Sequence, residues 1–202
     1  MEITCLTEAA ETFTANVYLV EGQQSTLVDA GAMPGIDDTV SSRVATLDSI
    51  VLTHRHADHV DQLDAIQRAF EPTVYAADAT GETVRIEDGD EVPIGGEPFE
   101  VVATPGHAPD HLAFVGNSVV FSGDIVVYSD GAFDNGSFGR TDIPGADRET
   151  LVESLEGLLE RLPDTVESLY PGHGPAFHGE VRAVIERGRE RAARGEPKYQ
   201  ED

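Results

Sequence analysis

The sequence predicts a layered α/β fold in a single domain. At 202 residues the chain is long enough for one sizeable hydrophobic core and short for two. Short β-like runs separated by turn residues fill the first half, and a helix, a strand and a second helix follow without a linker. We expect one domain over residues 1–195 and a disordered tail over residues 196–202.

The first half is expected to be mainly β-structure. Residues 16–20 and 25–28 are β-like runs separated by Glu21-Gly22, which predicts a hairpin. Residues 47–53 read as a buried strand, and apolar side chains from Leu63 to Phe70 follow at partial helical spacing. Further strands are expected over residues 73–76, 83–86, 99–103, 112–115 and 118–121, the last two joined by a two-residue turn at Gly116-Asn117.

The second half is expected to be mainly helical. Leucines from Leu151 to Leu162 recur at helical spacing, with Asp147 as the N-cap and Pro163 just past the end. A last strand over residues 166–170 and a charged helix over residues 180–194 complete the chain. This order of elements favours a layered α/β body.

The composition is strongly acidic. The chain has 38 Asp and Glu against 13 Lys and Arg, for a formal net charge of −25, and Lys198 is its only lysine. The negative charges repel one another, and this repulsion is best tolerated where salt screens it. We therefore predict a halophilic protein from a salt-filled cytoplasm. Nucleic acids and anionic membranes bind mainly through basic patches, so we expect neither as a partner and expect a small-molecule substrate instead. The composition does not indicate an oligomeric state.

Two features that the sequence lacks bear on where the protein is located and on how it could bind a metal. The start of the sequence has no basic region followed by an apolar region, and nowhere do 18 apolar residues run together, so we expect a soluble, cytoplasmic protein. Cys5 is the only cysteine, which excludes an intrachain disulfide and a cysteine-based zinc site. Any metal must therefore be held by histidines and carboxylates.

A cluster of such side chains follows the strand over residues 47–53. His54 and His56 are two residues apart on a backbone expected to be extended, so both point to the same face. Asp58 and His59 continue around the corner and face a different direction, which suits a second metal. Neutral imidazoles pack poorly and would repel one another when protonated, so this cluster indicates a metal site.

Three more candidate ligands follow predicted strands elsewhere in the chain. They are His107 in TPGH, Asp124 in SGD and His173 in PGHG. Each lies beside glycine, which allows the backbone to approach a site closely.

In their order along the chain, THRHADH, TPGH, FSGD, GRTD and YPGHG resemble the metallo-β-lactamase superfamily, in particular its glyoxalase II-like branch. The resemblance covers roughly residues 15 to 180. It implies a four-layer αββα sandwich with the site at the open edge of the two sheets. The strand and helix pattern is compatible with that fold.

The resemblance also implies a role for each candidate. The first metal would be held by His54, His56 and His107, the second by Asp58, His59 and His173, with Asp124 bridging both. Asp58 and Asp124 would be the catalytic carboxylates, Asp58 by orienting the attacking water.

Four further residues are expected to support the site or to lie apart from it. Asp29 either hydrogen-bonds a ligand histidine or is an ordinary turn residue, and Arg140 either pairs with Asp142, the favoured reading, or meets an anionic substrate. His111 is read as structural or as support for a ligand, and His178 as a surface residue.

For the metal, two Zn²⁺ ions are the default, with one Fe²⁺ or Mn²⁺ as the alternative. The expected enzyme is a metallo-hydrolase that attacks a thioester or related ester with a metal-activated water. The alternative is a mononuclear-iron persulfide dioxygenase, whose ligands would be His54, His107 and Asp124. The chain ends before the C-terminal helical domain with which glyoxalase II binds glutathione, which counts against that substrate. A nucleic-acid-processing role is least favoured because the inserted domain and basic surface of such relatives are missing.

Overall fold

The computed structural model describes residues 1–78, 81 and 83–198. The chain forms two compact units, residues 1–101 and residues 102–202, and strand β8 (Glu97–Ala103) carries it from the first to the second. The expectation of a single domain over residues 1–195 stays a prediction. None of the helices within these described residues is long and apolar enough to cross a membrane.

The first unit is built on a six-stranded sheet. Its strands follow one another in sequence order: β1 (Glu2–Cys5), β2 (Tyr18–Glu21), β3 (Ser25–Val28), β4 (Ser49–Val51), β5 (Thr73–Ala76) and β6 (Val84–Arg85). Strands β1 to β3 pair antiparallel, and β3 to β6 pair parallel. The predicted hairpin is confirmed as β2 and β3.

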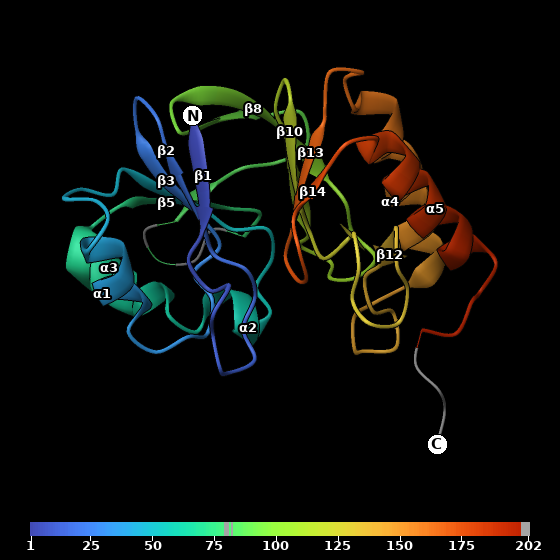
Figure 1. Cartoon of the computed structure of the whole chain (residues 1–202), viewed down its shortest axis with the longest axis horizontal. Helices are drawn as coiled ribbons and strands as arrows, with labels where there is room; N and C mark the ends of the chain where they lie inside the picture. The colour runs from blue at the N-terminus through green and yellow to red at the C-terminus, as the bar shows by residue number, and fades with distance from the viewer. Residues whose placement is uncertain (79–80, 82, 199–202) are drawn as a thin grey trace. The chain divides into compact units, whose positions relative to one another are not determined.

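Helices cover one face of this sheet. They are α1 (Ile36–Ser41), α2 (Ala57–Val60) and α3 (Leu63–Phe70), with α1 and α3 side by side in Figure 1. Ile36, Val40 and Ile66 on these helices are fully buried and form one apolar cluster with Leu27 and Ile50 of the sheet. Burial of these side chains, at about 25 cal/mol for each Å² of apolar surface, is the main force holding the helices to the sheet.

A tight hairpin completes the first unit. Strands β7 (Glu91–Ile94) and β8 pair antiparallel with Ile94 opposite Glu97. Gly95 and Gly96 form the two-residue turn, and both have positive φ angles, 63° and 84°. A turn with two such residues matches the twist of the strands, and glycine adopts it without strain.

The second unit has its own four strands in the order β14 (Phe177–His178), β13 (Ser168–Pro171), β10 (Val119–Gly123) and β9 (Leu112–Val115). Strands β10 and β13 run parallel, while the other pairs are antiparallel. Every residue of β9 and β10 is buried, as expected of strands covered on both faces. A small ribbon of β11 (Val126–Val127) and β12 (Ser137–Phe138) lies beside them.

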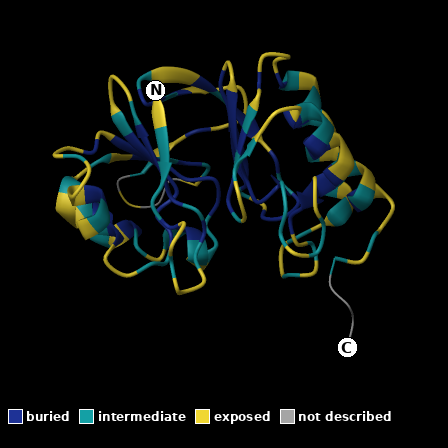
Figure 2. Ribbon diagram, in the orientation of Figure 1, coloured by how far each residue is buried: buried dark blue, intermediate teal, exposed yellow. Residues whose placement is uncertain are grey.

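Two long helices close the second unit. The leucine pattern forms α4 (Arg148–Arg161), and Leu151, Leu155 and Leu158 are fully buried in its core. The predicted N-cap is confirmed, because the carboxylate of Asp147 accepts the N–H of Thr150 at 2.8 Å. Helix α5 (Val181–Ala193) packs beside α4, and Figure 2 shows the buried faces of both as dark blue bands.

The differences from the predicted elements are local. The unpredicted elements are strands β1, β7, β11, β12 and β14 and helices α1 and α2, all of which are short; Pro93 within β7 also argues against a strand. The turn between β9 and β10 lies one residue later than predicted. The N–H of Gly116 donates to the carbonyl of Val119 at 2.8 Å, which centres the turn on Asn117 and Ser118.

The C-terminal segment is tied to the second unit by the only lysine. The ammonium of Lys198 lies 2.6 Å from the carboxylate of Asp130 and also donates to the carbonyl of Phe138. Burial alone would raise the pKa of Asp130, but the hydrogen bond and charge of Lys198, with the N–H of Phe133 and the hydroxyl of Ser137, hold that pKa below its ordinary value of 3.8. Of the predicted tail, residues 199–202 lie outside the described residues.

The ion pair predicts a pH-dependent contribution to stability. A carboxyl whose pKa is lower in the folded state stabilises the fold above its unfolded pKa, and this contribution is lost as the pH falls through the folded pKa. Lys198→Met should lower the free energy of unfolding at pH 7 by about 1–2 kcal/mol. In urea titrations the difference from the wild type should shrink below about pH 4.

Arg85→Met is the matched control, because Arg85 and Glu87 form an exposed pair at 3.7 Å. Removing it should change the free energy of unfolding by less than about 0.5 kcal/mol. A Lys198→Met variant as stable as the wild type at pH 7 would contradict the structural role of this pair.

Candidate metal site

Four of the candidate ligands lie at one strand-to-helix corner of the first unit. The chain leaves β4 at Val51 and reaches α2 at Ala57, so the corner carries His54 and His56, and the helix carries Asp58 and His59. His54 and His59 are buried, while His56 and Asp58 are partly exposed. The corner forms where the sequence predicted it.

The rings at this corner converge. The Nε2 atom of His54 lies 3.0 Å from Nδ1 of His56, and the ring centres of His54 and His59 are 4.0 Å apart. The Nε2 atom of His59 lies 3.9 Å from a carboxylate oxygen of Asp58. The corner therefore gathers ring nitrogens and a carboxylate in one small volume.

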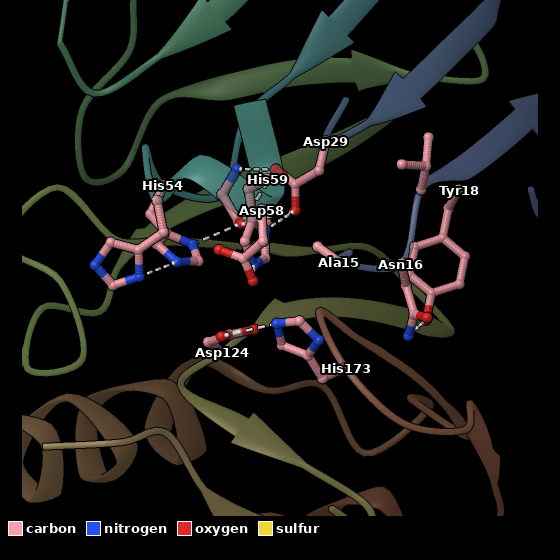
Figure 3. Close-up of polar contacts among 12 residues, drawn as sticks. Ala15, Asn16, Tyr18, Asp29, His54, Asp58, His59, Asp124 and His173 are labelled. Carbon is pink, nitrogen blue, oxygen red and sulfur yellow. Dashed lines mark hydrogen bonds and ion pairs between the residues drawn. The ribbon is translucent and has the colours of Figure 1, made fainter. Parts of the chain in front are cut away.

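Asp29 fixes the orientation of one ring (Figure 3). Its buried carboxylate accepts Nδ1–H of His59 at 2.8 Å and the N–H of Thr53 at 2.8 Å. Because Nδ1 of His59 donates to a carboxylate, the neutral ring presents Nε2 as a lone-pair donor. Asp29 has a positive φ of 62°, which is uncommon for a residue other than glycine. Of the two expectations for Asp29, the structure matches hydrogen bonding to a histidine.

The other three candidates lie together in the second unit. His107 follows β8, Asp124 follows β10 and His173 follows β13, each immediately or within a few residues. One oxygen of Asp124 lies 3.4 Å from Nε2 of His107 and 3.5 Å from Nε2 of His173, the latter contact shown in Figure 3. The ends of separate strands thus bring together side chains that are up to 66 residues apart in the numbering.

Close backbone contacts support this second group. Nδ1–H of His107 donates to the carbonyl of Arg140 at 2.9 Å, which leaves Nε2 to face Asp124. A Cβ atom on Gly139 would lie 2.1 Å from the carbonyl oxygen of Asp124, so only glycine fits there. Gly106 is equally confined, because a Cβ would lie 2.4 Å from the backbone of Leu151. Helix α4 and the Gly139 segment therefore hold the His107 and Asp124 loops in place.

His111 supports Asp124 through the backbone. The N–H of Asp124 donates to Nε2 of His111 at 2.9 Å, so this nitrogen must carry a lone pair. The neutral ring then has its proton on Nδ1, which donates to the hydroxyl of Thr104 at 2.7 Å. His111 is buried, and both of its ring nitrogens have these partners within the second unit. These contacts tie His111 to the backbone of Asp124, and its role as a structural residue or as support for a ligand stays a prediction.

Two other predicted residues lie where the sequence analysis placed them. The guanidinium of Arg140 makes two hydrogen bonds to the carboxylate of Asp142, at 2.9 and 2.7 Å, which hold the pKa of Asp142 below its ordinary value. His178 is exposed on β14 and contacts the hydroxyl of Ser168 at 2.9 Å. Sequence reasoning missed the role of the Arg140 carbonyl, since a main-chain acceptor has no signature in a sequence. It also missed Thr53 and Thr104, whose hydroxyls contact Asp29 and His111.

Pairs of donor atoms within each unit are spaced as the ligands of one metal ion would be. Ligands around tetrahedral zinc, with bonds of about 2.0–2.1 Å, lie roughly 3.3 Å from one another. The spacings of 3.0, 3.4 and 3.5 Å within the two groups are close to that value. The two contacts of Asp124 are longer than direct charged hydrogen bonds of about 2.7–2.9 Å. Imidazole and carboxylate together suit zinc, iron and manganese.

Comparison with known families gives a match over most of the chain. The model of the metallo-beta-lactamase superfamily matches residues 10–85 and 77–173. A probable metallo-hydrolase of Streptococcus pyogenes is 30% identical over 187 residues, which cover 79% of this chain and 78% of that protein. The residues matched by the family model include all seven candidate ligands, from His54 to His173.

Two further relatives bear on the chemistry. A hydroxyacylglutathione hydrolase of Ruegeria pomeroyi is 31% identical over 119 residues, covering 56% of this chain but only 47% of that enzyme. The crystal structure of ETHE1 from Myxococcus xanthus superposes with a TM-score of 0.76 at 27% identity, covering 98% of this chain and 87% of that one. The fold expected from the sequence is thereby confirmed.

A substitution of His111 tests its support of Asp124. His111→Phe keeps a ring but removes the acceptor, so the buried N–H of Asp124 loses its partner. We expect the free energy of unfolding to fall by about 1–3 kcal/mol. Metal affinity should fall about 10- to 100-fold. Urea titration and metal competition measure the two effects, and the exposed His178→Phe is the control. Unchanged hydrogen-exchange protection of the Asp124 amide would exclude the role.

Proposed function

Because this chain belongs to the metallo-β-lactamase superfamily and is a metallo-hydrolase within it, we propose that it hydrolyses a thioester or a related ester with two bound metal ions, zinc by default. The proposed ligands are the seven candidates: His54, His56, Asp58, His59, His107, Asp124 and His173. The observation that carries the proposal is the preset orientation of His59 and His107 by Asp29 and the Arg140 carbonyl.

The metals, when bound, would lower the pKa of a water molecule to near neutrality and polarise the carbonyl of the ester. The protein's own groups would then orient the reactants. The Asp58 carboxylate is partly exposed, so it can accept a hydrogen bond from the attacking water and receive its proton. Asp124 is held by His111 and can therefore keep its carboxylate fixed during turnover.

Two features support a hydrolase over the alternative. A dioxygenase would need His54, His107 and Asp124, whereas Asp58, His59 and His173 would have no metal to bind. Yet Asp29 is buried at a positive φ angle and fixes His59 through a hydrogen bond of 2.8 Å. Strained, buried carboxylates of this kind are usually retained for a function.

A mononuclear-iron persulfide dioxygenase is the second candidate function. The match to ETHE1 over nearly the whole chain favours it. The alignment with the hydroxyacylglutathione hydrolase spans less than half of that enzyme, so glutathione is not part of our proposal. The thiol and acyl groups of the substrate stay open at this stage.

Activity of the purified, metal-loaded protein separates the two candidates. The hydrolase reading predicts release of thiol from thioesters, and His59→Ala should lower kcat/KM at least about 100-fold by removing a ligand of the second metal. The exposed His178→Ala should leave kcat/KM within about twofold. Oxygen consumption on a persulfide with no thioester hydrolysis would favour the dioxygenase. Full activity of His59→Ala would contradict a required second metal.

We also propose that the protein works in a salt-rich cytoplasm. The support is the net charge of −25 with a single lysine. Ions at molar concentration shorten the Debye length to about 3 Å and so weaken the mutual repulsion of the carboxylates. The melting temperature should therefore rise between dilute buffer and molar KCl, as followed by circular dichroism. A melting temperature that stays constant or falls would contradict this adaptation.

A further inference from the structure

The loop between β1 and β2 carries an exposed aromatic side chain. It contains Phe13, which is 80% exposed and is the most exposed of the large apolar side chains among the described residues. The others in that group are Met1 at 46% and Val84 at 45%. A single exposed apolar residue is common on protein surfaces, so its position must decide whether it has a function.

Hydrogen bonds hold the two ends of this loop together. The hydroxyl of Thr7 donates to the carbonyl of Ala15 at 3.1 Å and accepts the N–H of Val17 at 3.0 Å. The N–H of Leu6 donates to the carbonyl of Val17 at 2.8 Å. The loop that presents Phe13 is therefore anchored at its base.

The same loop is bonded directly to the metal-ligand corner. The N–H of Ala15 donates to the carbonyl of Asp58 at 3.0 Å, and Figure 3 shows Ala15 beside Asp58. The hydroxyl of Thr14 accepts the N–H of Ala32 at 2.8 Å. The neighbouring Gly31 donates its own N–H to the main-chain carbonyl of His59 at 2.8 Å. Two residues span at most about 7 Å, so the backbone of Phe13 lies within about 7 Å of Ala15, the residue that is bonded to this corner.

The charge of this loop also bears on which substrates it can contact. Glu8 and Glu11 lie in the same loop as Phe13 and are exposed. The loop therefore has an apolar ring among acidic groups and no basic residue, so it suits an apolar group better than a phosphate or a carboxylate.

We propose that Phe13 forms an apolar wall of the substrate site and binds an alkyl or aryl group of the ester. The substrates would be thioesters or esters with an apolar group on the acyl side or the thiol side. This inference rests on the proposed hydrolase function and deepens it. Phe13 acts through apolar contact alone, so it affects which ester is bound and leaves the chemical step unchanged.

Two series of thioesters test the proposal. One varies the acyl group from acetyl to octanoyl on a fixed thiol, and the other varies the thiol with acetyl fixed. Complete burial of a methylene is worth at most about fourfold in kcat/KM, and contact with one wall about twofold. We expect kcat/KM of the wild type to rise with chain length in one series, and Phe13→Ala to flatten that rise while Phe13→Leu retains most of it. The rising series identifies the side that contacts Phe13.

Val84→Ala is the matched control, since Val84 is an exposed apolar side chain on β6. In this variant kcat/KM should depend on the chain length of the substrate as it does in the wild type. No variant should change the melting temperature by more than about 2 °C. If kcat/KM rises with chain length equally in the wild type and in Phe13→Ala, the proposal is overturned. Phe13 would then be a surface residue or a contact for another protein.

A binding measurement separates this proposal from the proposed function. Octanoate and octanethiol mimic the two products, and saturation-transfer NMR reports their binding without turnover. Binding of at least one of them that weakens in Phe13→Ala but not in Val84→Ala supports the apolar wall even if no thioester is hydrolysed. If neither binds, or both bind Phe13→Ala as well as the wild type, the apolar wall is excluded, whatever the activity.

Discussion

The candidate site depends on one constraint, which is that a histidine can bind a metal only through a nitrogen that carries no proton. In this chain an acceptor holds Nδ1–H in two of the rings: the Asp29 carboxylate for His59 and the Arg140 carbonyl for His107. Both bonds leave Nε2 with its lone pair, and Nε2 of His107 faces the Asp124 carboxylate at 3.4 Å. A water molecule in place of either acceptor would let the ring rotate or exchange its proton.

The two units position their candidate ligands in different ways. In the first unit a single corner after β4 supplies all four candidate ligands, and Asp29 follows the end of the neighbouring strand β3. In the second unit the three candidate ligands follow the ends of three strands, and glycines allow their loops to pack closely. Gly139 and Gly106 each lie where a Cβ atom would overlap with the backbone of another segment. These two glycines therefore serve close packing of the loops.

The sequence predicted the corner because its signal is local: two histidines two residues apart at the end of an apolar run, followed by an aspartate and a third histidine. It also predicted α4, whose leucine spacing and Asp147 cap are local. It offered a histidine as one possible partner of Asp29 but could not say that this is His59, and it did not predict that the Arg140 carbonyl meets His107, since these contacts span 30 and 33 residues. Strand β7 was missed because it contains proline, and Phe13 because exposure is a property of the folded chain.

The central claim is that the seven candidate ligands hold two metal ions, and metal content tests it most directly. Elemental analysis should be made on protein purified without added metal, with His59→Ala and His178→Ala beside the wild type. We expect about two ions per chain, zinc by default, in the wild type and His178→Ala, and about one in His59→Ala. One iron per chain in all three proteins would contradict it.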